Sequence, residues 1–474
     1  MSQESDSEVM SEAAYTARER SVLLLACCFA AFMTPLLSTM MNLSLISIGE
    51  EFGVGSHSQA YVNTAFLLSS VIFMVPMAKL ADIMGKRRTF ILGVLIILIS
   101  SILASFSPAF WFLVACRACI GAGAAMITTT SISLITDVYP RDRRGGAIGM
   151  QTMCVYIGLA AGPPLGGVVN DLWGWHVVFW IVVPLALCSL LVMSMFRHEI
   201  APCRGDRMDM LGAVLYGLSM VFVMGGVINL PESSAVLSIL VGLVLLALFI
   251  RSQSPDRVRL FNISLFRNRT FTGSCMAAFL AYASSYSVGF FLALYLLSIG
   301  GLTSTEAGVL MLVQPAVQAV GTPLFGRLSD RVADDRILPT AGIGIVGIGI
   351  FSLMTFGMET SLLQLVVTMV ILGFGFSVFS SPNMSVIMSS VPPRETSEAS
   401  SMVSFMRQTG MMVSMGIAMT FISVIMGTAD NLIPENYGDF LDVMFWSFLV
   451  CLAMCIAGMA ASYLRDPNRT SDDE

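Results

Sequence analysis

Apolar stretches long enough to cross a membrane recur along the whole chain, and short polar segments separate them. A stretch of roughly 20 apolar residues crosses the hydrocarbon core of a bilayer as a helix, because a helix satisfies its own backbone hydrogen bonds. The pattern therefore predicts an all-α integral membrane protein with fourteen transmembrane helices. These spans are expected at residues 21–46, 58–78, 89–107, 110–135, 145–169, 176–196, 210–229, 235–251, 271–298, 305–325, 338–357, 362–389, 399–426 and 440–463.

Positively charged residues support this count independently. Of the 25 Lys and Arg, 23 lie in the two tails and in every second connection between predicted spans, and the seven alternate connections hold none. By the positive-inside rule, both tails and these charged connections are expected to be cytoplasmic. The membrane we expect is the cytoplasmic membrane. Residues 1–19 are acidic and polar, so no cleavable signal peptide is expected, and the first span serves as its own anchor.

Composition narrows the function classes. The chain is 56% hydrophobic and only 12% charged, whereas soluble proteins carry about 25% charged residues. Its ten cysteines show no pairing pattern, and Cys116 and Cys119 form a C-x-x-C inside a predicted helix with no histidine near. We therefore expect no metal, no cofactor, no nucleic-acid partner and no enzymatic activity. A membrane sensor without flux is the alternative from another functional class.

A loose internal repeat suggests two halves. The segments 78–88 and 326–336 each follow the second span of a six-span half, and both contain a small residue, a leucine, an aspartate and a basic turn. Repeated halves are typical of secondary transporters, whose substrate site lies near the membrane midplane between them. The predicted organisation is a tail at 1–20, a six-helix bundle at 21–200, an inserted helix pair at 201–269, a second six-helix bundle at 270–464 and a tail at 465–474.

Four motifs carry a family resemblance. They are "AKLADIMGKRR" at 78–88, "RACIGAGAAM" at 117–126, "GLAAGPPLGG" at 158–167 and "MRQTG" at 406–410. With substitutions at Ala78, Ile83 and Ile120, they resemble motifs of the major facilitator superfamily, specifically its fourteen-span drug:proton antiporter branch. The resemblance implies a 6+2+6 layout of two pseudo-symmetric bundles that rock around a central cavity. It also implies multidrug efflux, with a small-molecule substrate exchanged for protons.

The glycine-rich motif and the two basic turns are candidates for conformational switching. Glycines spaced four residues apart share one helix face and allow a neighbouring backbone to approach, and internal prolines should kink the helix. The alternatives are tight packing alone for the glycines and solvated turn caps for the aspartates. The switching candidates are Asp82, Gly85, Arg87, Gly158, Gly162, Pro163, Gly166, Gly167, Gly326, Asp330 and Arg331.

The middle of the predicted spans contains arginines but no acid. None of the 31 Asp and Glu lies at mid-span, and Ser38 occupies the position where the resembling branch has a membrane acid. One hypothesis is that a peripheral acid, Glu306 or Asp442, couples protons to transport. The other is that the protein carries organic anions or metabolites by using Arg117 and Arg407, although Arg117 has the structural alternative of bonding helix carbonyls.

Polar residues within the spans supply the candidates for a substrate cavity. Each side chain could bind a substrate or hydrogen-bond one helix to another, and the sequence leaves both open. The candidates are Ser38, Asn42, Asn63, Arg117, Gln151, Tyr282, Tyr286, Gln314, Gln318, Asn383, Arg407 and Gln408. The expected protein is thus a monomeric secondary active exporter of small amphipathic compounds that works by alternating access.

Overall fold

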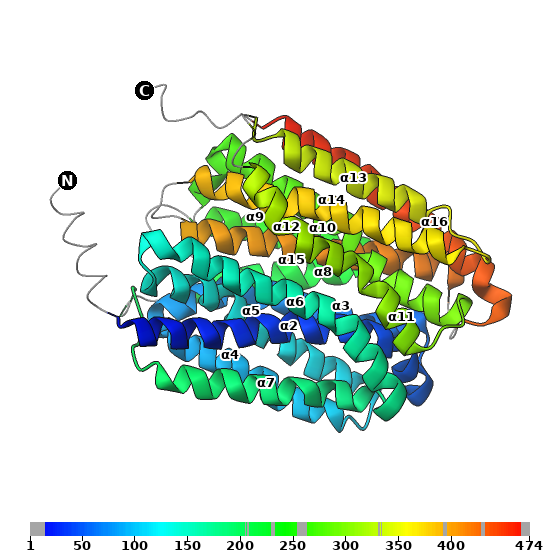
Figure 1. The fold of residues 1–474 in the computed structure, drawn as a ribbon, viewed down its shortest axis with the longest axis horizontal. Coiled ribbons are helices and arrows are strands. Elements are labelled where there is room, and N and C mark those ends of the chain that lie inside the picture. The colour runs from blue at the N-terminus through cyan, green and yellow to red at the C-terminus, as the bar shows by residue number, and fades with distance from the viewer. Residues whose placement is uncertain are drawn as a thin grey trace.

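The computed structural model describes residues 15–203, 205, 208–228, 233–253, 263–329, 332, 334–391, 396–427 and 432–465. This part of the chain is helical throughout, without strands. The long helices run roughly side by side, and both chain ends lie at the same end of the bundle (Figure 1). The helices are α2 (Ala17–Phe52), α3 (Ser56–Met84), α4 (Lys86–Ser105), α5 (Phe110–Val138), α6 (Arg141–Trp173), α7 (Trp175–Met195), α8 (Met210–Ile228), α9 (Ser233–Ser252), η1 (Ile263–Arg267), α10 (Arg269–Leu294), η2 (Tyr295–Ile299), α11 (Ser304–Met311), α12 (Val313–Ser329), α13 (Ile337–Leu353), α14 (Leu362–Ser389), α15 (Thr396–Phe421), η3 (Ile422–Met426), η4 (Pro434–Asn436) and α16 (Tyr437–Tyr463).

The number of membrane-spanning helices agrees with the sequence. Within the described ranges, 13 helical stretches are long and apolar enough to cross a bilayer, with α11 and α12 counted as one stretch, and the shorter apolar helix α13 is the fourteenth. The prediction of fourteen spans in an all-α membrane protein is therefore confirmed. We call the end of the bundle that carries Ala17 and Tyr463 the terminus side, and the opposite end, which carries Phe52 and Ser304, the far side.

Several helices extend beyond their apolar stretches because capping residues, and not hydropathy, end them. Helix α2 begins after a capping box in which the Thr16 side chain and the Glu19 carboxylate each bond the other's backbone N–H. It ends at Gly53, whose φ of 63° is a left-handed conformation that glycine adopts without strain. The sequence prediction of 21–46 for this span stopped where the polar residues begin, so it omitted both ends.

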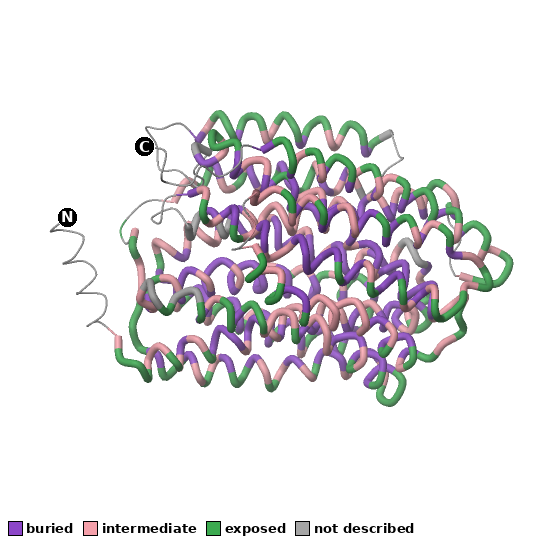
Figure 2. The backbone as a smooth tube through the Cα atoms, turned by 45° about the horizontal axis from the view of Figure 1, so that its top comes forward, coloured by how far each residue is buried: buried purple, intermediate pink, exposed green. Residues whose placement is uncertain are grey.

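The helices pack as two groups of six with an inserted pair. In the first group α2 packs on α6 and α7, and α5 packs on α3 and α4; in the second, α14 packs on α12 and α13, and α10 on α15 and α16. Helices α8 and α9 pack on each other, and α8 also contacts α3 and α15. The two groups meet where α6 contacts α11 and α12 and where α3 contacts α15. Buried residues are concentrated in the middle of the bundle (Figure 2).

Three glycines of α6 form a closely packed face against α2. A Cβ atom added to Gly158 would meet the Phe32 carbonyl, and one added to Gly166 would lie 2.7 Å from the Met40 Cα. Gly162 faces the Thr39 side chain in the same way, and α6 continues as one helix through its two prolines. The predicted close approach on this face is confirmed, while a gating role for it remains a prediction.

We expect Gly166→Ala to destabilise the protein because the added methyl group would force the α2 backbone away. Overpacking of this kind costs about 1–3 kcal/mol. Gly149→Ala is the matched control: it lies in the same helix, and nothing lies within 4 Å of its added Cβ. Thermal unfolding of the two purified variants in detergent should give a lower melting temperature for Gly166→Ala alone, and equal melting temperatures would contradict the packing argument.

Candidate functional site

A buried arginine organises the polar residues of the first group. Arg117 on α5 is fully buried, and its Nε donates to the Val62 carbonyl at 3.1 Å. Its Nη2 lies 3.5 Å from Asn63 Oδ1, and Asn63 Nδ2 donates to Asn42 Oδ1 at 2.8 Å. The guanidinium also lies over the Phe66 ring, 4.9 Å from its centroid, in a cation–π contact. Three predicted candidates thus form one network across α2, α3 and α5.

This network borders the second group of helices. A Cβ added to Gly289 on α10 would lie 3.4 Å from Asn42 Nδ2, so the α10 backbone passes close to the amide. The Ser38 side chain lies near that of Tyr286, which also lies on α10. The Nη1 atom of Arg117 is buried without a partner. The polar residues Ser38 and Asn42 of α2 therefore lie where the two groups meet. The Nη1 group of Arg117, which belongs to the same network, is a charged donor without a partner among the described residues.

A second cluster, centred on Arg407, draws on both groups. The Arg407 guanidinium lies 6.0 Å from the centroid of the Tyr282 ring, which in turn lies 5.7 Å from Phe376. Tyr156 of α6 approaches from the first group, and its hydroxyl hydrogen-bonds Ser380 of α14 at 3.0 Å. Arg407 and both tyrosines are only partly buried. We name these five residues the arginine–tyrosine cluster.

The arginine–tyrosine cluster combines residues that the sequence predicted with residues that it missed. Arg407 and Tyr282 were cavity candidates, whereas Tyr156, Phe376 and Ser380 were not. A tyrosine inside the otherwise apolar span at 145–169 was the available signal for Tyr156. Among the described residues Arg407 has no carboxylate partner, and its described contact is the one with the Tyr282 ring.

The described carboxylates lie near helix ends, away from both arginines. Glu306 is exposed and caps α11, where its carboxylate accepts from the Thr303 N–H at 2.9 Å. Asp442 is exposed in the second turn of α16. Neither proton-coupling candidate lies in the middle of the bundle. The central polar residues therefore form a region of positive charge without a compensating acid in the described part of the chain.

The remaining predicted cavity residues are distributed differently. Gln408 Nε2 donates to Ser70 Oγ at 3.3 Å and so links α15 to α3 across the two groups. Asn383 instead donates to the Ser274 carbonyl at 3.1 Å and accepts from Arg465 at 3.3 Å, which ties α14, α10 and the end of α16 together within the second group. Gln151 is buried on α6, and Gln314 and Gln318 are half-buried on α12.

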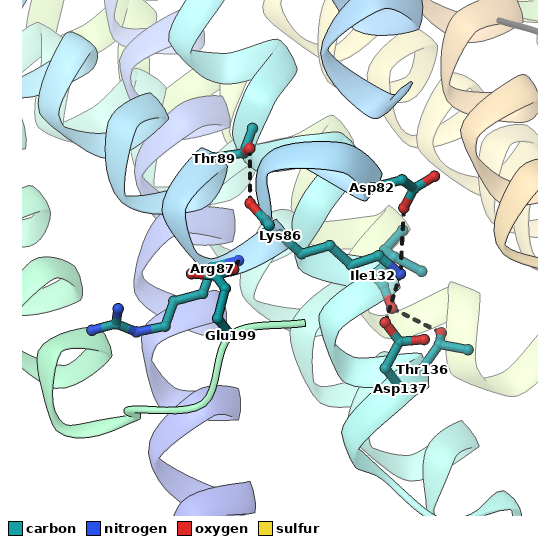
Figure 3. A network of polar contacts seen from close by, with 9 residues as sticks. Asp82, Lys86, Arg87, Thr89, Ile132, Thr136, Asp137 and Glu199 are labelled. Atoms are coloured by element: carbon teal, nitrogen blue, oxygen red, sulfur yellow. Dashed lines mark hydrogen bonds and ion pairs between the residues drawn. The ribbon is translucent and has the colours of Figure 1, made fainter. Parts of the chain in front are cut away.

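The basic turn after α3 is held by charges within the first group (Figure 3). Lys86 is buried and forms ion pairs with Asp137 at 2.6 Å and with Asp82 at 3.7 Å. The carboxylate of Glu199, which follows α7, accepts from the Arg87 N–H at 3.0 Å. Gly85 has a φ of 116°, and an added Cβ would collide with Glu199, so this position requires glycine.

The corresponding turn of the second group is only partly described. Asp330 and Arg331 lie outside the described residues. A Cβ on Gly326 would lie 2.6 Å from Ser381 Oγ, so α12 packs closely on α14 at this point. Further along, hydrogen bonds from Arg336 lower the pKa of Asp334 to about 2. The described ion pairs of both turns are therefore local and do not join the two groups.

The two groups are joined most closely at the far side, along what we call the α6–α11 seam. A Cβ added to Gly167 would collide with the Ser304 carbonyl, and one added to Gly308 would collide with the Pro163 carbonyl. Asn170 Nδ2 donates to Ser304 Oγ at 3.1 Å. The glycine motif thus packs α6 against α2 on one face and against α11 on another. The gating candidates Pro163 and Gly167 lie in this seam.

Two helical groups with polar and charged residues between them have the architecture of a secondary transporter. The chain belongs to the Major Facilitator Superfamily, whose family model matches residues 27–249 and 274–474. This membership indicates a transporter and not an enzyme.

Relatives of known name share a quarter of the sequence. The chain is 25% identical over 443 residues to the riboflavin transporter RibZ of Clostridioides difficile (strain 630), a match that covers 93% of this chain and 96% of RibZ. It is 26% identical over 406 residues to the multidrug resistance protein Stp of Mycobacterium tuberculosis (strain CDC 1551 / Oshkosh), covering 84% of this chain and 75% of Stp.

Solved structures share the fold. A bacterial homologue of the human lysosomal transporter Spinster, in an inward-facing and unoccupied conformation, matches with a TM-score of 0.66 and 20% identity over 95% of this chain and 97% of that chain. A POT family transporter in complex with a thioalcohol-conjugated peptide matches with a TM-score of 0.71 and 15% identity over 93% and 95%. At these identities the likeness concerns the fold alone.

We expect Lys86→Met to destabilise the first group because it removes the buried ammonium group that pairs with both Asp82 and Asp137 and leaves the two carboxylates to repel each other. Removing one partner from a buried charged network costs about 1–3 kcal/mol. The loss should shrink as the pH falls, since protonation of either carboxylate removes the repulsion. Arg88→Met is the control, because the Arg88 side chain is 68% exposed and lies 3.7 Å from its partner Glu199. Thermal unfolding of both variants between neutral and acidic pH measures the effect, and a loss independent of pH would contradict this assignment.

Proposed function

We propose that this protein is a secondary active exporter that moves small amphipathic compounds out of the cell in exchange for protons. It would work from the cytoplasmic membrane with the terminus side in the cytoplasm, as the distribution of Lys and Arg favours. The observation that carries the proposal is the arginine–tyrosine cluster. Its residues come from both six-helix groups, as an alternating-access site requires, and relatives such as Stp are named as multidrug resistance proteins.

The mechanism follows from the position of this cluster between the groups. A ligand that contacts Tyr156 on one group and Arg407 on the other would draw the groups together around it. Opening the far side would separate α6 from α11, and opening the terminus side would separate the groups at the other end. Aromatic rings supply flat contact surface for varied ligands, and the partly buried guanidinium supplies orientation.

A second candidate is a carrier of organic anions or metabolites. It is favoured by the two arginines, Arg117 and Arg407, which have no carboxylate partner in the described part of the chain. Positive charge between the groups would attract anions and repel lipophilic cations. One relative is named as a riboflavin transporter, which supports the view that proteins similar to this chain also carry compounds other than cationic drugs.

The test uses purified protein in liposomes with a pH gradient imposed in either direction. Uptake of a lipophilic cationic dye and of an anionic aromatic dye is followed in parallel. Movement of either dye against its gradient, coupled to opposite proton flow, supports the exporter. Movement of the anion without proton coupling supports the second candidate, and the absence of protein-dependent flux of both dyes would contradict transport of this kind.

We expect Arg407→Gln to reduce uptake of the anionic dye by roughly 10- to 150-fold, because a charge-assisted hydrogen bond is worth roughly 1.5–3 kcal/mol. Uptake of the cationic dye should be unchanged or faster. Arg327→Gln is the matched control, since Arg327 is an exposed arginine near the end of α12. Equal uptake of the anion by wild type and Arg407→Gln would contradict the proposal that the arginine–tyrosine cluster binds the transported compound.

A further inference from the structure

The first turn of α11 is completed by a residue of the other six-helix group. Within its own chain segment, the Thr303 hydroxyl accepts from the Glu306 N–H at 3.3 Å. The N–H groups of Ser304 and Thr305 donate instead to the two carboxylate oxygens of Asp171, at 3.2 and 2.8 Å. The Thr305 hydroxyl donates to the same carboxylate. Asp171 on α6 therefore caps a helix that belongs to the second group.

This cap cannot survive separation of the two groups. Asp171 lies four residues after Gly167, so both residues share a face of α6, and Gly167 is in backbone contact with Ser304. Any movement that opens the α6–α11 seam must therefore withdraw the carboxylate from the two N–H groups. The first-turn donors of α11 would then be satisfied only by water.

The contact is expected to depend on the charge of Asp171. A helix N-terminus carries a partial positive charge and binds a carboxylate better than a neutral acid. A protonated carboxyl group also loses acceptor capacity, because one oxygen becomes a donor. Protonation of Asp171 would therefore weaken the α6–α11 seam while leaving the glycine contacts unchanged. Asp171 is exposed at the far side, so protons from that side can reach it.

The neighbouring titratable groups are engaged elsewhere. Glu51 at the end of α2 accepts from Trp175 Nε1 at 2.7 Å and lies 3.5 Å from His176 Nε2 on α7. Glu306 on α11 bonds its own cap, and Glu50 is exposed on α2. None of these groups is a hydrogen-bond or ion-pair partner of Asp171 among the described residues, so the seam responds chiefly to this one carboxylate.

We propose that Asp171 is a proton-sensitive latch that holds the far side closed when it is ionised and releases α11 when it is protonated. The latch deepens the proposed function, on which it rests for the identity of the far side as the side of substrate release. The same contacts that favour the carboxylate resist its protonation, so release by acid alone requires a pH below about 4, the range in which a free aspartate is protonated. At higher pH the latch stays ionised and yields only when the two groups are drawn apart. Asp171 acts on the conformation and does not contact the arginine–tyrosine cluster.

Hydrogen exchange tests the latch directly, because it reports the Ser304 and Thr305 N–H groups themselves. The full-length protein in lipid nanodiscs is compared with Asp171→Asn, which keeps the shape of the side chain and removes its charge. We expect exchange in peptides covering 303–311 to become roughly two- to fivefold faster, the size expected when the negative charge at a helix N-terminus is removed. Asp442→Asn is the control, since it neutralises another exposed far-side carboxylate. Unchanged exchange in Asp171→Asn would overturn the proposal.

A pH series on the unmodified protein supplies a second, independent measurement. Exchange rates are divided by those of an unstructured peptide at the same pH, and peptides from the interior of α5 report any global unfolding. Protection of 303–311 should be constant above the aspartate range, fall in the wild type as the pH is lowered below about 4, and stay low and constant in Asp171→Asn. Protection that does not change with pH in the wild type would overturn the latch. Neither exchange measurement needs a substrate. A result that contradicts the latch can therefore be told apart from a result that contradicts the exporter proposal, which the dye assay tests.

Discussion

Helix α6 can lie against α2 and α11 at once only because it has no side chains where those helices meet it. Gly158, Gly162 and Gly166 face α2, and Gly167 faces α11, whose Gly308 in turn meets the Pro163 carbonyl. Membrane helices gain little from hydrophobic burial against one another, so close backbone packing of this kind is a main source of their association. The result is a helix firmly packed in its own group that also forms the wall against the other group.

A second constraint is electrostatic. Arg117 is buried with a backbone carbonyl and an asparagine as partners, and Arg407 lies beside tyrosines, while the described carboxylates remain near helix ends. A charge inside the membrane is expensive and persists where it has a structural or transport role. In this chain the positive charge lies between the groups, and the exposed acid Asp171 lies where they touch. In the proposed mechanism, substrate selection and the charge-dependent latch lie in different parts of the molecule.

The fourteen spans, their order and the glycine face followed from local patterns, because hydropathy and four-residue spacing are properties of single helices. Helix ends were less accurate, since capping residues such as Thr16 and Gly53 determine them. Contacts between distant segments could not be derived: Asn383 pairs with Arg465, and Asp171 with Thr305, across long sequence separations. The spacing of Asp171 and Gly167 on one helix face was the only local signal for the latch.

The central claim is that the α6–α11 seam opens as the terminus side closes. Spin-label distances test it most directly, with one pair at Leu172 and Val309 on the far side and another at Met150 and Leu328 on the terminus side, all exposed positions. On adding a transported compound, the far-side distance should lengthen while the terminus-side distance shortens. If both distances stay constant, or both change in the same direction, the seam is not the gate and the account is wrong.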